Sequence, residues 1–354
     1  MITQGFRIRD LAGRLSGTQA EQKHGGPRRI TETHGKNMTP WNSASLQGNG
    51  VCFSARLQET PTRVRLEALA GLWQSQPVTD ALVFVFGLIF GSFLNVCIRR
   101  LPQHESLVRP GSHCPRCQMP IRARDNIPVI SYLLLGGRCR ECRELISPEY
   151  PLVELLTGLL FLGCYWQFGV TLVGVKWTLF SAILLVLTFT DFHERLLPNR
   201  MNYFGLAAGL GLSPFTPAVD GLGRWLLNGQ FALGAPEWAV SLADSALGAI
   251  VAGGLLWLFA EGYFRLRGRE GMGLGDVKMM AMAGAFLGVR QAILMMLLGS
   301  VLGSVVGAIA IWGFGKGRDY ELPFGSFLGI AGLFLIFAGG PLLHWYLTAS
   351  GLAR

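Results

Sequence analysis

Two aspartates stand at the ends of apolar runs, where charged side chains are uncommon. Asp276 closes the glycine-rich stretch GMGLGD and an apolar run follows it at once, whereas Asp191 ends an apolar run in LTFTDFHERLLPN. A charge well inside a bilayer costs about 2.5 to 3.5 kcal/mol, so such residues usually serve chemistry or pairing. Two carboxyl groups held close together share a proton, and one can deprotonate a water while the other polarises a carbonyl. We therefore predict that Asp191 and Asp276 form a catalytic pair of the aspartic-protease type.

Helix capping is the alternative interpretation of each aspartate taken alone. Asp276 would meet the positive terminus of the helix that it begins, and Asp191 would lie at the end of another. The glycines at 271, 273 and 275 favour catalysis, because they let the backbone bend and approach a substrate strand closely. If the apolar segments alternate across a membrane, both aspartates fall on one face, and this coincidence also favours the catalytic interpretation.

Four cysteines form two C-x2-C pairs separated by 21 residues. Paired knuckles at this spacing can present four thiolates tetrahedrally to one zinc ion. Disulfides are the weaker interpretation, because cytoplasmic thiols are kept reduced, and four unrelated thiols are the remaining one. A site with four cysteine ligands is closed, so we expect a structural zinc ion bound by Cys114, Cys117, Cys139 and Cys142. His113 adjoins the first of them and is not expected to bind the metal.

The elements that must position these residues are membrane helices. The chain of 354 residues is 50% hydrophobic, only 15% charged, and carries 47 glycines, a balance unlike that of a soluble enzyme. Apolar runs recur at about the 20 residues that a helix needs to cross the hydrocarbon core. We predict an all-α, polytopic membrane bundle of about eight segments, of which the fourth and sixth are short. They lie near 79–98, 151–168, 172–190, 200–214, 239–262, 276–288, 291–314 and 324–347.

The chain has a net charge of +9, and beyond the N-terminal tail its basic residues lie mostly in the loops between the apolar runs. The loop from Arg99 to Glu149 alone carries nine arginines. Positive loops mark the cytoplasmic side, so we place this loop and both aspartates there. The basic residues are not gathered on a soluble domain with aromatic platforms, which argues against nucleic-acid binding and favours anionic lipid headgroups as neighbours.

Four regions follow from this pattern. We expect a disordered N-terminal tail at 1–77, a first transmembrane helix at 78–98, a zinc-binding loop domain at 99–150 and a transmembrane catalytic bundle at 151–348. Glu154, directly after the loop, is expected to tie it to the bundle, and His193 is interpreted as a loop residue. The string Gly-Ser-Phe-Leu occurs at 91–94 and 325–328, which we interpret as coincidence or as small-residue helix packing.

Several of these stretches together resemble the bacterial type IV prepilin peptidases, over residues 80–347. The resemblance rests on GSFLNVCIRRLP, on the two cysteine knuckles joined by DNIPVISYLLLGGRC, and on SPEYPLVELLTG, TDFHERLLPN, GMGLGDVKMMAMAGAFLG and LPFGSFLGIAG. It does not cover the N-terminal tail, which is longer than the leader usual in the family. We therefore expect translation to begin downstream of Met1.

The resemblance implies a multi-pass aspartic protease of the bacterial inner membrane whose active site faces the cytoplasm. The family's catalytic pair falls on Asp191 and Asp276. Its substrate would be a prepilin or pseudopilin, whose short basic leader is removed from a long apolar helix. The complete cysteine loop resembles that of members which also methylate the new N-terminus with S-adenosylmethionine, although the sequence shows no separate methyl-donor motif.

Two other functions remain open at this point. The chain could be a methyltransferase only, with structural aspartates. It could also be a zinc-regulated transporter or assembly scaffold in which Asp191, Asp244 and Asp276 form an ion path, although an inverted repeat is not evident. The sequence leaves open which pilin is cut, whether pilus assembly or secretion is served, and whether the chain forms a homo-oligomer.

Overall fold

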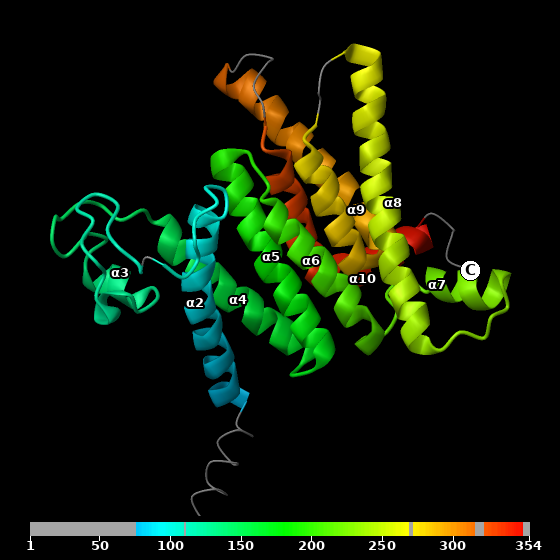
Figure 1. Ribbon diagram of the computed structural model, residues 1–354, viewed down its shortest axis with the longest axis horizontal. Coiled ribbons are helices and arrows are strands. Elements are labelled where there is room, and N and C mark those ends of the chain that lie inside the picture. Colours follow the sequence, from blue (N-terminus) through cyan, green and yellow to red (C-terminus); the bar gives the residue numbers. More distant parts are fainter. Residues whose placement is uncertain (1–75, 110, 269–271, 316–321, 350–354) are drawn as a thin grey trace, which may run out of the picture. The chain divides into compact units, whose positions relative to one another are not determined.

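The computed structural model describes residues 76–109, 111–268, 272–315 and 322–349, and every regular element among them is a helix (Figure 1). The predicted N-terminal tail up to residue 75, Cys52 and Gly271 lie outside the described residues. Strands are absent from the described part, which has only isolated bridges at His113–Pro120 and Arg138–Leu145. The predicted all-α class is therefore confirmed.

Seven longer helices build the bundle. They are α2 (Gln76–Arg100), α4 (Glu149–Phe168), α5 (Leu172–Glu194), α6 (Asn199–Leu212), α8 (Glu237–Arg267), α9 (Leu274–Phe314) and α10 (Phe324–Ala349). Short helices occupy the connections, with α3 (Ile130–Leu134) in the cysteine loop and α7 (Leu222–Arg224) before α8. Six of the longer helices are long and apolar enough to cross a membrane. The exception is α6, whose 14 residues fall short of the roughly 20 required.

A kink divides helix α9 into two helical stretches. The sequence predicts two segments here, 276–288 and 291–314, and the kink lies at Gly288, whose backbone departs from helical geometry with φ 74° and ψ −176°. The carboxylate of Asp220 lies against this break and accepts the backbone N–H of Arg290 at 2.9 Å. A side chain from another element thus satisfies an N–H group that the kink exposes.

The bundle is held together by close helix pairs. Helix α8 packs along α9, α2 along α4, and α10 lies against both α5 and α9 (Figure 1). Gly248 of α8 and Gly284 of α9 meet at a crossing where a Cβ atom on either would overlap the carbonyl oxygen of the other. Small residues allow such close backbone approach, which is how helices associate within a bilayer. Phe180 and Phe286 stack at 4.6 Å between ring centroids in the core.

The outer faces of the bundle are apolar. Large hydrophobic side chains such as Phe86, Ile250 and Val305 are exposed there. An exposed apolar surface of this kind would favour association in water, whereas lipid tails cover it without cost. Together with the six long apolar helices, this surface identifies a membrane protein.

Candidate active site

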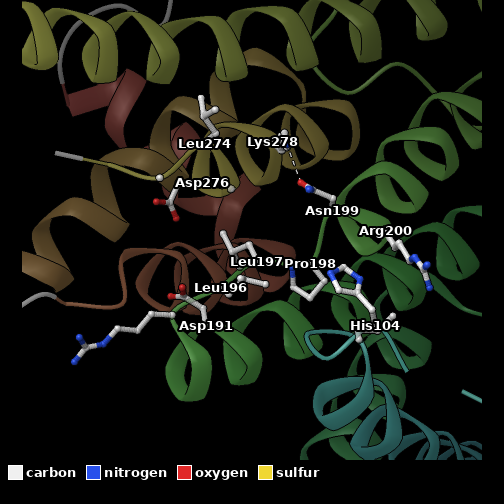
Figure 2. A pocket seen from close by; sticks show the side chains of 14 residues that line it. His104, Asp191, Leu196, Leu197, Pro198, Asn199, Arg200, Leu274, Asp276 and Lys278 are labelled. Atoms are coloured by element: carbon white, nitrogen blue, oxygen red, sulfur yellow. Dashed lines mark hydrogen bonds between the residues drawn. The ribbon is translucent and has the colours of Figure 1, made fainter. Parts of the chain in front are cut away.

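Asp191 and Asp276 line the same pocket, whose cavity is about 350 Å³ (Figure 2). Their carboxyl groups point toward each other across it, one from the last turn of α5 and the other from the first turn of α9. The 195–200 connection, the 273–275 elbow and two residues after α2, Leu101 and His104, complete the wall. The structure thus brings together two residues that are 85 positions apart in the sequence.

Asp191 is held from a third helix. Its Oδ2 atom accepts hydrogen bonds from the backbone N–H of Ser326 at 2.6 Å and from the Ser326 hydroxyl at 2.9 Å. Ser326 lies in the first turn of α10, where free N–H groups and the helix dipole favour a carboxylate. A Cβ atom on the neighbouring Gly325 would lie 3.1 Å from the Asp191 carboxyl carbon. Residue 325 must therefore be small for the carboxylate to sit at the helix terminus.

Asp276 is positioned by the glycine elbow. It is the third residue of α9, is 8% exposed, and donates its backbone N–H to the carbonyl of Gly273 at 3.1 Å. A Cβ atom on Gly275 would lie 3.1 Å from the Cβ of Leu197, so the elbow lies directly against the 195–200 connection. Backbone packing, together with the helix start, directs the Asp276 side chain into the pocket.

Basic side chains surround the two carboxyl groups. His104, Arg195, Arg200 and Lys278 all line the pocket. Lys278 donates a hydrogen bond to Asn199 Oδ1 at 2.8 Å, and its ammonium lies 5.6 Å from the centre of the Tyr203 ring. These contacts keep Lys278 at the pocket wall.

The arrangement is suited to hydrolysis. Two carboxyl groups that face one cavity can share a proton, hold a water between them and act on it as base and acid. Both are at least nine-tenths buried, with Asp191 5% exposed, so bulk water is largely excluded from them. A peptide bond that enters this cavity would meet both groups at once.

Sequence reasoning missed Gly325 and Ser326 as site residues. The second Gly-Ser-Phe-Leu string was interpreted as coincidence or packing, but its first two residues contact the Asp191 carboxylate. In the first string, Gly91 does pack closely, because a Cβ there would lie 2.7 Å from the Glu154 Cα. The repeated string was a detectable signal, since in both copies it lies against an acidic residue of another helix.

The four cysteines of the loop converge. Their sulfur atoms all lie within 4.8 Å of one another, and Cys114 Sγ and Cys142 Sγ are 3.8 Å apart. A tetrahedron of thiolates around zinc, with bonds of about 2.3 Å, has sulfur atoms about 3.8 Å apart. The donor set and its spacing therefore fit a metal ion. His113 is not part of the cluster and contacts the carbonyl of Gly111 instead.

The two knuckles have the same backbone. In each knuckle, the carbonyl of the first cysteine accepts the backbone N–H of the residue four positions later. The N–H of that cysteine donates to the carbonyl five positions later, which belongs to Met119 for Cys114 and to Glu144 for Cys139. Gln118 and Arg143 follow the second cysteine of each pair, and both have φ 59°. Backbone N–H groups, chiefly that of Cys117, lower the pKa of the Cys114 thiol to about 7 despite partial desolvation. The Glu144 backbone lowers the pKa of the Cys142 thiol, but burial and the neighbouring Cys139, Cys117 and Cys114 together raise it to about 12. Metal binding would therefore be accompanied by loss of protons from the cluster, because the thiolate is the form that binds metal.

The remaining residues singled out from the sequence lie elsewhere. Glu154 accepts the backbone N–H of Val129 at 2.8 Å and so contacts the cysteine loop, as expected. His193 is not in a loop but in the last turn of α5, where its Nε2 lies 2.9 Å from Glu149. Asp244 is away from the pocket and accepts backbone N–H groups of residues 220, 221 and 223. Asp244 does not line the pocket of Asp191 and Asp276, so an ion path through that pocket would not include it.

Comparison with known proteins agrees with this architecture. Residues 85–168 match the model for the bacterial peptidase A24 N-terminal domain, and residues 178–308 match that of the type IV leader peptidase family. Three similar curated proteins are each named prepilin leader peptidase/N-methyltransferase. That of Aeromonas hydrophila is 36% identical over 76% of this chain and 93% of its own length. That of Neisseria gonorrhoeae is 34% identical over 77% of this chain and 96% of its own length. That of Pseudomonas aeruginosa is 34% identical over 78% of this chain and 97% of its own length.

No solved structure matches the chain significantly. The family matches cover α2, α4 and the helices that carry both aspartates, and the relatives match over nearly their whole length. The sequence matches and the membrane helices agree, and this chain belongs to the type IV leader peptidase family and is a membrane protease.

Proposed function

We propose that the protein removes the short basic leader from type IV prepilins or pseudopilins, with Asp191 and Asp276 as its catalytic pair. The observation that carries this proposal is the single cavity into which both carboxyl groups point. The name of the relatives, prepilin leader peptidase/N-methyltransferase, supports the choice of substrate. The cavity also lies at helix ends, where the junction between a charged leader and an apolar helix would lie.

The geometry suggests which aspartate acts as the base and which as the acid. Ser326 holds Asp191 Oδ2 with two hydrogen bonds, which leaves Oδ1 to take a proton from a bound water. Asp276, on the facing wall, would donate the shared proton to the oxygen of the scissile carbonyl. Water then attacks the carbonyl carbon, and the proton held by the pair passes to the leaving amine. The sum is hydrolysis of one peptide bond.

Asn substitution of either aspartate tests the assignment. Asp191→Asn or Asp276→Asn should abolish leader removal, because an amide can neither accept the proton of water nor donate one as an acid. The measurement is the mass of a prepilin after incubation with each purified variant. Asp80→Asn is the matched control, since Asp80 lies outside the pocket and its contact with Trp166 needs only an acceptor oxygen. Cleavage by either active-site variant at the control's rate would refute the proposal.

A second activity follows from the same product. We propose that the protein transfers a methyl group from S-adenosylmethionine to the new N-terminal amine, as the name of the relatives suggests. The mass measurement above separates the two activities, because loss of a leader and gain of a methyl group change the pilin mass differently. A pilin that is cut but keeps its unmethylated mass would contradict this second proposal alone.

The membrane arrangement is also proposed. The nine arginines between Arg99 and Glu149 support a cytoplasmic location in the inner membrane for the cysteine loop and the pocket. We propose zinc as the metal of the four thiolates, because tetrahedral sulfur coordination is its usual structural site. The division into a tail, a first helix, a zinc-binding loop domain and a catalytic bundle, at the boundaries predicted above, completes the proposal.

A further inference from the structure

Two buried polar side chains behind the wall of the aspartate pocket have no hydrogen-bond partner in the described part of the chain. They are Thr190 of α5, whose hydroxyl is unpaired, and Asn202 of α6, whose amide nitrogen and oxygen are both unpaired. Thr190 is 0% exposed and Asn202 is 1% exposed, and neither lines the pocket. Nearly all buried polar groups in proteins are hydrogen-bonded, so these three atoms require an explanation.

The Thr190 hydroxyl differs from those of other threonines in the bundle. A hydroxyl within a helix commonly bonds the carbonyl one turn earlier. Thr157 donates to the carbonyl of Val153 at 2.7 Å, and Thr188 donates to that of Leu184 at 2.7 Å. Thr190 makes no such bond among the described residues, so its hydroxyl is available to a partner outside α5.

Both unpaired side chains lie on the faces of α5 and α6 that pack together. A Cβ atom on Gly205 of α6 would lie 3.3 Å from the Cδ1 atom of Ile183 of α5. Thr190 is two turns after Ile183, and Asn202 is one turn before Gly205. Each of them therefore shares a helix face with a residue at this contact.

Both side chains are also close to the pocket. Asp191, which lines it, directly follows Thr190, and Asn199, which lines it too (Figure 2), is one turn before Asn202. The Cα–Cβ bond of a helical residue tilts toward the N-terminus of its helix. The Asn202 side chain therefore extends toward the end of α6 that forms the pocket wall.

Water suits these groups better than another ligand does. A peptide cannot reach atoms that are buried behind the pocket wall. An amide and a hydroxyl offer both donors and acceptors and carry no charge, as water does. A metal cation such as calcium takes about six oxygen ligands, which two side chains cannot supply. Buried waters typically make about three hydrogen bonds to groups that otherwise have no partner.

We propose that Thr190 and Asn202 hold internal water behind the pocket of the aspartates, and that this store supplies the water that hydrolysis consumes. The inference rests on the peptide hydrolysis proposed above and deepens it. It makes Thr190 and Asn202 positioning residues, which act through water and not on the substrate.

A store beside the pocket meets a requirement of cleavage in a membrane protein. Asp191 and Asp276 are already buried, and a substrate helix that fills the cavity displaces the solvent from it. One water must still reach the carboxyl pair. Its oxygen and one hydrogen enter the new carboxyl group, and its other proton passes through the pair to the leaving amine. The atoms balance without a further reactant.

Two substitutions at position 202 test the role of the amide. Asn202→Leu removes the polar atoms at nearly constant volume, whereas Asn202→Ser keeps a donor and an acceptor but leaves more space. We expect the leucine variant to lose about tenfold or more in kcat for leader removal with KM within about twofold, and the serine variant to stay within about threefold of the wild type. A role in packing alone predicts the reverse order, because leucine fills the core and serine leaves a cavity.

The hydroxyl is tested by Thr190→Val, which should lower kcat by about threefold to tenfold. Thr157→Val is the matched control, because Thr157 is equally buried but its hydroxyl is bonded within α4. The control should cleave prepilin at the wild-type rate. Equal kcat values in the two variants would overturn the assignment of Thr190.

X-ray radiolysis detects the water without any reference to activity, because it converts bound water into hydroxyl radicals that oxidise neighbouring methionines. Met279 and Met282 are 0% exposed, and a Cβ atom on Gly205 would lie 2.7 Å from the Cγ atom of Met282. We expect oxidation of Met279 or Met282 in the wild type and its loss in Asn202→Leu. Met295, also 0% exposed, should stay unmodified in both. A wild type without this oxidation would overturn the water site.

The stored water and the proposed function fail in different ways. Cleavage by the wild type with unchanged kcat in Asn202→Leu would reject the stored water and leave the aspartate pair in place. Oxidation of the two methionines in a wild type that cuts no prepilin would reject the proposed function and, with it, the hydrolytic use of the water.

Discussion

Ser326 orients the side chain of Asp191, a residue 135 positions away in the sequence. Its N–H and its hydroxyl both reach Asp191 Oδ2, so the carboxylate is fixed by two donors from the start of α10. The hydroxyl oxygen also lies 3.0 Å from the carbonyl oxygen of Thr188, one turn earlier in α5, so its single proton is shared between the two acceptors. The hydrogen bonds leave a single orientation for the Asp191 side chain, and orientation within a fraction of an ångström governs reaction rates in such sites.

Ser326→Ala should lower the rate of leader removal by roughly tenfold to a hundredfold, since it removes a hydrogen bond to a charged group but keeps the backbone donor. The rate is measured with purified protein and a saturating amount of prepilin. Ser300→Ala is the control, because the Ser300 hydroxyl bonds only the carbonyl of Met296 within α9. Equal rates in the two variants would show that the Ser326 hydroxyl does not position Asp191.

At the scale of elements, the close pair of helices α8 and α9 positions one of the two pocket aspartates. Helix α9 holds Asp276 at its start and packs along α8 through the Gly248–Gly284 crossing. The groups that meet there are backbone atoms of two helices, which cannot rotate away as side chains do. The position of α9, and with it that of Asp276, therefore depends on the absence of side chains at this crossing.

Gly284→Ala should destabilise the protein by about 1 to 3 kcal/mol or more, because the added methyl group overlaps the Gly248 carbonyl of α8. Thermal unfolding in detergent, followed by tryptophan fluorescence, measures the loss. Gly254→Ala on α8 is the matched control, since a Cβ there meets nothing within 4 Å. The close-packing argument fails if the two variants unfold at the same temperature.

At the scale of the whole molecule, the cysteine loop and the helical bundle are stabilised differently. The bundle has a core of buried apolar side chains, including Phe180, Leu184 and Phe286. The described residues of the loop between α2 and α4 are mostly exposed and polar, with Cys114 and Ser131 among the few buried ones. A segment with so little core requires a metal or another cross-link to fold. A bidentate ion pair also links Arg140 to Asp125, at 2.9 and 2.6 Å, but one such pair does not replace a core.

Cys114→Ser combined with Cys142→Ser should remove the bound metal and unfold the loop while the bundle stays folded. Elemental mass spectrometry should find about one zinc ion per chain in the wild type and far less in the double variant. Limited trypsin digestion should then cut within 101–148, because the unfolded backbone on either side of the exposed arginines can enter the protease. Cys164→Ser, in α4 and outside the cluster, should keep its metal. A double variant with full metal content would contradict the site.

The sequence by itself determined the helical class, the residues of the two chemical clusters and the approximate segments, because these follow from local patterns. Apolar length predicts a spanning helix, the C-x2-C spacing brings two thiolates to one turn, and a glycine elbow before Asp276 predicts a helix start. Only the tertiary structure showed that Ser326 holds Asp191, that Asp220 accepts an N–H group at the Gly288 kink, and that Leu101 and His104 reach the pocket of the aspartates. Such contacts join residues far apart in the chain, and they depend on how helices cross, which no local period encodes.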